Sequence, residues 1–174
     1  TIPEELKDFY SLGGQFHFRW DRIRKDAYLG GASETGLWKT GNVWNEDDIN
    51  EAIKEVNEGN FVGSYGIEEV NTVRESLKAA DMNNKSVLVI GSSQPWIELI
   101  CLSLGAKKVT TLEYGEIISN HPQIKTETPS TIRKKFLEGT LEKFDGIVTH
   151  SSIEHSGLGR YGDALNPWGD ILAV

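Results

Sequence analysis

Short apolar runs alternate with helical patterns through the second half of this chain. The run SVLVIG, residues 86–91, is short and rich in β-branched residues, which is typical of a strand covered on both faces of a sheet. A stripe of apolar residues at helical spacing over residues 67–80 predicts a helix just before it. Because strands that alternate with helices pair in parallel through right-handed crossovers, this order predicts a doubly wound, mostly parallel α/β sheet.

The alternation continues to about residue 150. A complete sheet of this type usually has further strands, so we expect this sheet to be truncated after its fourth strand. Either the chain is a fragment, or the back half of the fold has been lost or is supplied by another chain. The elements expected after residues 86–91 are a helix over about 95–104, a strand over 108–114, a short strand over 123–126, a helix over about 130–138, a strand over 144–150 and a short helix over about 166–174.

The first 62 residues are irregular and rich in Gly, Trp and Asn. We expect residues 1–62 to form an N-terminal extension packed on the core, and residues 63–174 to form the α/β domain, together a single compact unit. Within the extension the pattern predicts a short helix near residues 3–12. A second helix is predicted over residues 47–56, with Asp47 as its cap and Gly59 at its end.

The composition weighs against some classes of function. The formal net charge of −8 and the isoelectric point near 5.0 oppose binding to nucleic acid or anionic lipid. No run approaches the roughly 18 consecutive apolar residues that span a bilayer. We also see no signal peptide at the start, and the sequence does not indicate a localisation. The single cysteine, Cys101, excludes an intrachain disulfide and lies in an apolar run, which predicts a buried thiol.

Three segments are expected to meet where the strands end. If the strand order begins 3-2-1-4, the ends of the first, second and fourth strands border one crevice, where open parallel sheets bind their ligands. After the first strand, Gly91 allows close backbone approach, Ser93 or Gln94 can cap the next helix and Pro95 fits its first turn. Only one glycine stands where a dinucleotide fingerprint has three, so a simple strand-to-helix turn remains an alternative.

Glu113 ends the second strand, 22 residues after Gly91. One βαβ unit requires about 20 residues, and a carboxylate at this place can accept hydrogen bonds from both hydroxyls of a ribose. A lone solvated glutamate is the alternative.

The stretch after the fourth strand carries the densest polar chemistry. His155 could act as a base, with Glu154 or Asp163 orienting it, and Ser151 and Ser152 stand before it. The alternatives are that Glu154 caps a helix and that Arg160 pairs with Asp163 to pin the loop. A further alternative is a zinc site, although its ligands would lack any recognised spacing. These ligands would be His150, Glu154, His155 and Asp163.

The segments VLVIGSSQPWIE, LGAKKVTTLEYGEI and FDGIVTHSSIEHSGLGRYGDALNPWGD together resemble the family called domain of unknown function 268, which is itself similar to class I S-adenosylmethionine-dependent methyltransferases. The resemblance implies a Rossmann-like core of methyltransferase type with S-adenosylmethionine as cofactor. The usual first motif has an acidic residue where Val89 stands, which leaves Glu98 as a candidate partner of the cofactor's ammonium group. By position, the methionine part would lie against Gly91 and Ser92, the ribose against Glu113, the adenine near Thr126–Thr128, and the methyl group and acceptor near Ser151–His155. Ser93 and Ser151 are expected to bind the cofactor as well.

Three functions follow as hypotheses. The first is a methyltransferase-like protein that acts on a small or peptide-borne nucleophile, with His155 as base and Tyr161 and Asp163 shaping the acceptor site. The second is a catalytically silent Rossmann-fold subunit of a larger complex, with a protein partner covering the truncated sheet edge. The third is an enzyme with a nicotinamide dinucleotide as cofactor, since Glu113 could bind the ribose of that cofactor too. Anchors for a partner would be Trp20, Trp38 and Trp44, and residues 16–26 would form an amphipathic basic segment or an anion site.

Overall fold

The computed structural model of the protein describes residues 2–18, 43–161 and 163–173. The predicted basic segment and the residues Trp20 and Trp38 fall mainly or wholly outside this part of the chain. A four-stranded parallel sheet forms its centre, in the order β5-β3-β2-β6. Its strands are β2 (Ser86–Ile90), β3 (Lys108–Leu112), β5 (Ile124–Glu127) and β6 (Gly146–Thr149).

The four predicted strands are therefore present, and their order along the sheet is the expected 3-2-1-4. The result is a mixed α/β fold with parallel strands, compatible with a Rossmann-like fold. A small second sheet was not predicted from the sequence. It pairs β1 (Val43–Trp44) in parallel with β4 (Ile118–Ser119).

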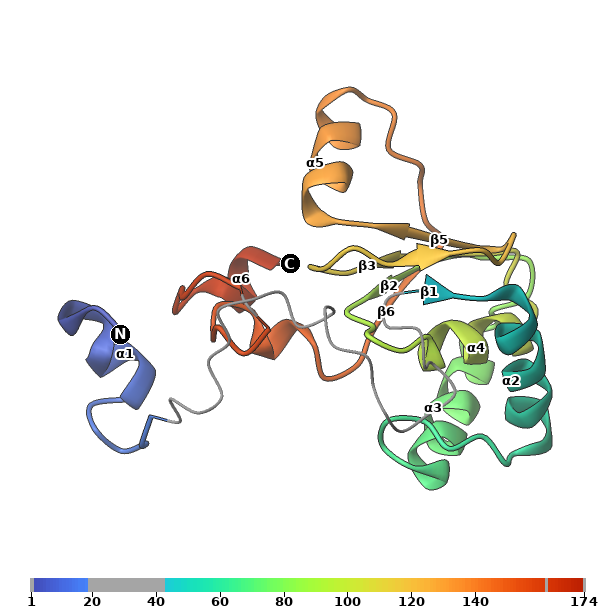
Figure 1. Cartoon of the computed structure of the whole chain (residues 1–174), viewed down its shortest axis with the longest axis horizontal. Helices are drawn as coiled ribbons and strands as arrows, with labels where there is room; N and C mark the ends of the chain where they lie inside the picture. Colours follow the sequence, from blue (N-terminus) through green and yellow to red (C-terminus); the bar gives the residue numbers. More distant parts are fainter. Residues whose placement is uncertain (1, 19–42, 162, 174) are drawn as a thin grey trace.

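Three helices cover one face of the central sheet (Figure 1). They are α2 (Glu46–Glu58), α3 (Ile67–Ala79) and α4 (Trp96–Ser103), and α4 contacts β2 and β3 while α2 and α3 pack against α4. Apolar side chains of these elements form the core. The core includes Trp44, Ile49, Ala52, Val56, Val70, Val87, Val89, Ile97, Leu99, Ile100 and Val109.

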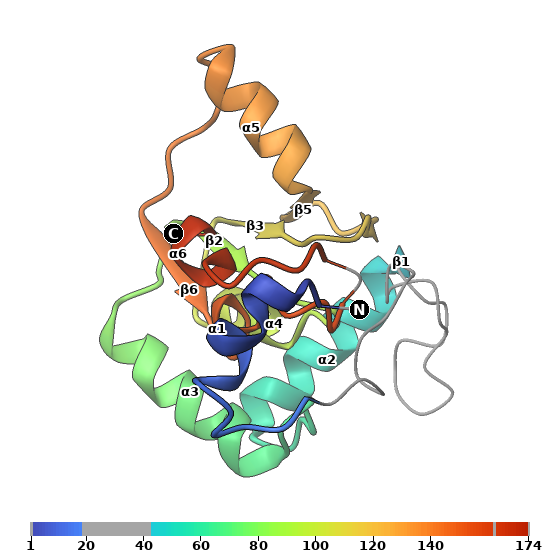
Figure 2. The ribbon, with the colours of Figure 1, turned by 90° about the vertical axis from the view of Figure 1, so that its left-hand side faces the viewer.

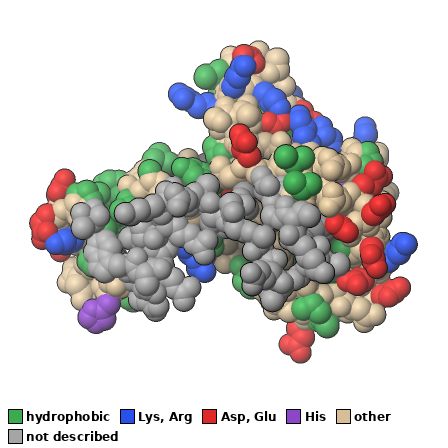
Figure 3. All heavy atoms as spheres, in the orientation of Figure 1, with side chains coloured by type: hydrophobic (Ala, Val, Ile, Leu, Met, Phe, Trp, Pro, Cys, Tyr) green, Lys and Arg blue, Asp and Glu red, His purple; other side chains and the backbone are tan. Residues whose placement is uncertain are grey.

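The other face of the sheet is covered differently. Helix α5 (Pro129–Leu137) stands away from the sheet on the side opposite α2, α3 and α4 (Figure 2). Its start is well defined, because the side chains of Thr128 and Thr131 form a reciprocal capping box and Pro129 occupies the first turn. Lys and Arg side chains gather over α5, and Asp and Glu side chains over α2 (Figure 3).

The first and last described segments lie side by side. A 3-10 helix η1 (Glu4–Leu6) runs into α1 (Lys7–Ser11), and the chain ends in α6 (Gly169–Ala173). The Tyr10 hydroxyl donates a hydrogen bond to the Gly157 carbonyl oxygen at 2.8 Å, and the rings of Phe9 and Trp168 lie 5.2 Å apart.

Some details of the helix ends differ from the sequence predictions. Helix α2 begins after Asn45, so Asp47 lies in its first turn, where a negative charge suits the helix dipole, and is not the cap. Helix α4 begins after Pro95 without a side-chain cap, so neither Ser93 nor Gln94 caps it. Gly59 ends α2 with a φ of 75°, as predicted.

Two further predictions concern partners and membranes. Trp44 is completely buried in the core, so it is not available as an anchor for a partner. Within the described ranges, no helix has the length and apolar character needed to cross a bilayer.

Candidate ligand-binding site at the carboxyl ends of the strands

A cavity of about 980 Å³ lies at the carboxyl ends of β2, β3 and β6. Cavities of this size hold small molecules and cofactors. The turns that follow the three strands form its floor, α5 forms one wall, and the loop 155–166 with α6 forms another. Of the predicted site residues, those that line the cavity are Gly91, Ser92, Ser93, Glu113, Ser151, Ser152, His155, Tyr161 and Asp163.

The turn after β2 requires a glycine. Gly91 has a φ of 78°, and a Cβ atom placed on it would lie 1.7 Å from the Oγ atom of Ser152. The backbone of the β2 turn therefore contacts the turn after β6 directly. The Gly91 amide also donates a hydrogen bond to the Leu112 carbonyl oxygen at 2.9 Å, which ties it to the end of β3.

Glu113 lies beside that turn. Ile90 pairs in register with Leu112, so Gly91 and Glu113 are the next residues beyond two adjacent strands. Glu113 is only 8% exposed, and its Oε1 atom accepts a hydrogen bond from the Tyr114 amide at 2.7 Å. The predicted proximity of Gly91 and Glu113 is therefore present in the structure.

Glu98 does not line the cavity, contrary to what its candidate role toward a cofactor would need. It is completely buried, and its carboxyl group accepts hydrogen bonds from Ser92 Oγ at 3.1 Å and from Thr111 Oγ1 at 2.7 Å. Burial raises the pKa of Glu98 to about 7, although the two hydroxyl groups oppose that rise. A direct contact between Glu98 and a ligand would require the turn to move.

The residues expected near an adenine, Thr126–Thr128, make contacts within the fold and do not border the cavity. Thr126 Oγ1 donates to the Ile117 carbonyl oxygen at 2.6 Å, and Thr128 caps α5, and none of Thr126–Thr128 lines the cavity. The next residues along the chain line it instead. They are Pro129, Ile132, Arg133 and Phe136 of α5. The sequence could not show this, because the placement of α5 beside the cavity depends on the packing of the whole fold.

The segment after β6 places His155 at the cavity and Glu154 outside its lining. His155 and Glu154 belong to the 3-10 helix η4 (Ile153–His155), and His155 Nε2 lies 3.9 Å from Glu154 Oε1. The ring of Tyr161 meets the His155 ring edge-on at 5.8 Å between centroids. Burial raises the pKa of the Tyr161 phenol above its ordinary value.

Asp163 organises the loop between η4 and α6. Its carboxylate accepts hydrogen bonds from the amides of Gly157 at 2.7 Å, Gly159 at 3.1 Å and Tyr161 at 3.1 Å. The charge pair considered for Arg160 and Asp163 is replaced by another contact, because the Arg160 guanidinium lies 5.4 Å from the centre of the Tyr161 ring. Of the two carboxylates expected to orient His155, Asp163 binds these loop amides, and Glu154 lies beside the histidine ring.

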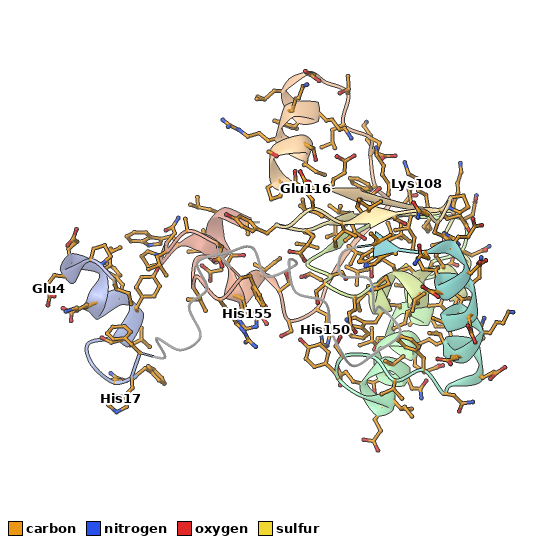
Figure 4. The ribbon with its side chains drawn as sticks, viewed as in Figure 1. Glu4, His17, Lys108, Glu116, His150 and His155 are labelled. Atoms are coloured by element: carbon orange, nitrogen blue, oxygen red, sulfur yellow. The ribbon has the colours of Figure 1, made fainter. Side chains whose placement is uncertain are left out.

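His150 lies at the cavity, as expected for the end of the fourth strand, but the contacts that it makes there were not predicted from the sequence. His150 Nε2 forms a 2.9 Å hydrogen bond with Glu69 Oε1 of α3, and the rings of Tyr65 and Trp96 lie 5.0 and 4.9 Å from the His150 ring. His150 and His155 both follow β6, but His150 turns toward α3 and His155 lies beyond it along the loop (Figure 4). Across the ranges described, no group of three or more His, Cys, Asp or Glu side chains is arranged to hold a metal ion.

The fold and the cavity define an α/β protein with a parallel sheet and a ligand-sized site at the ends of its strands. Residues 84–174 match the family DUF268, described as Caenorhabditis protein of unknown function. The chain belongs to this family. The matched residues include all three turns of the cavity floor, α5 and the loop held by Asp163. None of the curated proteins matches the chain.

Proposed function

We propose that the cavity binds S-adenosylmethionine and that the protein is a class I type methyltransferase for a small or peptide-borne nucleophile. The observation that carries this proposal is the position of Glu113 next to the Gly91 turn in one cavity. A buried carboxylate at the end of the second strand can accept hydrogen bonds from both ribose hydroxyls. The glycine turn brings backbone close to the rest of the ligand.

The cavity also supplies a group for proton transfer. The bound cofactor would supply a methyl group on a sulfonium centre. His155, with Glu154 at 3.9 Å from its Nε2 atom, would take the proton from the acceptor nucleophile as the new bond to the methyl carbon forms and the bond from that carbon to sulfur breaks, which would leave the neutral thioether S-adenosylhomocysteine. Tyr161 and the loop around Asp163 would position the acceptor, since little more than orientation is required of the protein.

Calorimetric titration with S-adenosylhomocysteine tests the proposal. We expect micromolar binding, reduced about tenfold or more by Glu113→Ala and by Glu113→Gln, because either change removes a charged hydrogen-bond acceptor. Glu51→Ala is the matched control, since Glu51 is exposed on α2 and outside the cavity. NADH titrated in parallel should not bind. Binding of NADH in place of the homocysteine compound would favour the dinucleotide hypothesis.

A second function, that of a catalytically silent assembly subunit, is favoured by a different observation. Strand β6 forms one edge of the described sheet, and Ile147 on this strand is 64% exposed. An apolar side chain on an edge strand is suited to pairing with a partner. If folded protein binds neither ligand and associates through this edge, sedimentation velocity should show an assembly that Ile147→Lys disperses.

A further inference from the structure

A carboxyl group lies directly behind the cavity turn after β2. Glu98 of α4 is completely buried, with Oε2 accepting from the hydroxyl of Ser92 and Oε1 from that of Thr111. Ser92 lines the cavity, and Thr111 belongs to β3, the strand that leads to Glu113. The Glu98 carboxyl group therefore links the cavity turn to the neighbouring strand from inside the protein.

The surroundings of Glu98 do not neutralise its charge. The described faces of α2, α3 and β2 that join α4 in the core are apolar, and no cation forms an ion pair with Glu98 there. The titratable groups that interact with it are the Glu113 carboxylate, whose negative charge opposes ionisation, and the Cys101 thiol. Burial and the charge of Glu98 raise the pKa of Cys101 to about 12, so that thiol stays neutral. The apolar faces are made by Ile49, Ala52, Val56, Val70, Val87 and Val89.

We propose that Glu98 is a positioning residue whose buried carboxyl group sets the conformation of the turn 91–94 and, through it, the affinity of the cavity for its ligand. The second half of this statement rests on the proposed function, and the first half does not.

Hydrogen-bond chemistry explains how the charge of Glu98 reaches the turn. An ionised carboxylate only accepts, so the hydroxyls of Ser92 and Thr111 must both donate to it. A neutral carboxylic acid donates one hydrogen bond, so one of the two hydroxyls must become an acceptor and turn its own proton elsewhere. Because Ser92 stands in the cavity turn, protonation of Glu98 changes hydrogen bonding at the site itself.

Glu113 follows β3 next to the same turn, and its negative charge contributes to the raised pKa of Glu98. The two charge states of Glu98 hold Ser92 differently beside the carboxylate that binds the ribose in the proposed function, so the two states should differ in affinity for the ligand. Because the pKa of Glu98 is raised to about 7, the switch between the two forms falls near neutral pH.

The first test uses no ligand. We expect the backbone amide resonances of residues 91–94 to shift with a midpoint near pH 7 in wild-type protein. Glu98→Gln, which mimics the neutral carboxyl group, should abolish this titration, and Glu51→Gln should not. A titration that persists in Glu98→Gln, or no titration in the wild type, overturns the proposal.

The second test measures the affinity for S-adenosylhomocysteine. In wild-type protein we expect this affinity to change about fivefold or more between about pH 6 and about pH 8. The Glu98→Gln variant should keep the low-pH affinity throughout. Equal pH dependence in both proteins overturns the link between Glu98 and binding. If neither protein binds the compound at any pH while the turn amides still titrate, the positioning role of Glu98 stands and the methyltransferase proposal fails.

Discussion

A Cβ atom on Gly91 would lie 1.7 Å from Ser152 Oγ, so the turns after β2 and β6 approach each other too closely to admit any side chain at residue 91. The φ of 78° at Gly91 is itself unfavourable for other residues. Gly91 is thus needed both for the path of the backbone and for the contact that closes the cavity floor.

Gly91→Ala should lower the free energy of unfolding by about 2–5 kcal/mol, because backbone strain and overpacking add. The matched control is Gly139→Ala. Gly139 also has a positive φ, of 67°, but nothing lies within 4 Å of a Cβ there, so only strain of about 1 kcal/mol is expected. Urea denaturation measures both. The double variant Gly91→Ala with Ser152→Gly should recover part of the loss, and equal losses in the two single variants would show that Ser152 does not matter.

The stability of the protein should fall as the pH rises through neutrality because of Glu98. Its pKa is raised from 4.5 to about 7 in the folded state, so the stabilisation is fully present below pH 4.5 and is lost as the pH rises to about 7. From about pH 6 to about pH 8, the free energy of unfolding should fall by about 1.4 kcal/mol because of this one group. Urea denaturation gives the free energy of unfolding of the wild type and of Glu98→Gln at each pH. The difference between the two proteins isolates the contribution of Glu98, since the other groups titrate in both. Parallel pH profiles for the two proteins would contradict the prediction.

Glu127 shows the opposite sign. Burial by itself would raise the pKa of Glu127, but hydrogen bonds from Lys135, Thr131 and Lys125 outweigh it and lower the pKa to about 2. The stabilisation is therefore present above pH 4.5 and is lost as the pH falls toward 2.

Lys135→Met should destabilise the protein by about 1–2 kcal/mol at neutral pH and raise the pKa of Glu127, since Lys125 remains as a partner of the buried carboxylate. Lys134→Met on the same helix is the control, because Lys134 is largely exposed and its contact with Glu138 is long, at 4.0 Å. Carbon NMR of the Glu127 carboxyl group gives the pKa directly. An unchanged Glu127 titration in Lys135→Met would mean that Lys125 alone stabilises the charge.

Replacement of Asp163 should loosen one wall of the cavity more than it lowers global stability. Asp163→Ala removes the acceptor of three backbone amides, so hydrogen exchange at Gly157, Gly159 and Tyr161 should speed up. Asp170→Ala in α6 is the control, since Asp170 is exposed and accepts one hydrogen bond, from the amide of Ile171. Unchanged exchange at the three amides would show that the loop keeps its shape without the carboxylate.

Much of the fold could be predicted from local patterns. The run at residues 86–91 became β2 (Ser86–Ile90), and the apolar stripe at residues 67–80 became α3 (Ile67–Ala79). The expected order of the strands, and with it the meeting of Gly91 and Glu113, also holds. These predictions depend on periodicity and on the handedness of crossovers, which act over short stretches of chain.

Other features have only a weak local signal. The strands β1 and β4 are two residues long, too short to show an alternating pattern, and they pair across about 75 residues. His150 meets Glu69 across 81 residues. Glu98 did have a signal, since it stands in the apolar run WIELICLS, but that run does not say what the buried carboxyl group touches.

Residue type and spacing along the chain thus specify the helices, the strands and the three turns where a ligand would bind. Packing in three dimensions decides the rest: that Glu98 faces inward to Ser92 and Thr111, that Asp163 holds the loop, and that α5 borders the cavity. The physical reason is that the pattern that specifies a helix or a strand repeats every two to four residues, so it is present in a short stretch of sequence. The surroundings of a buried charge depend on residues that the chain brings together only when the whole sheet has formed.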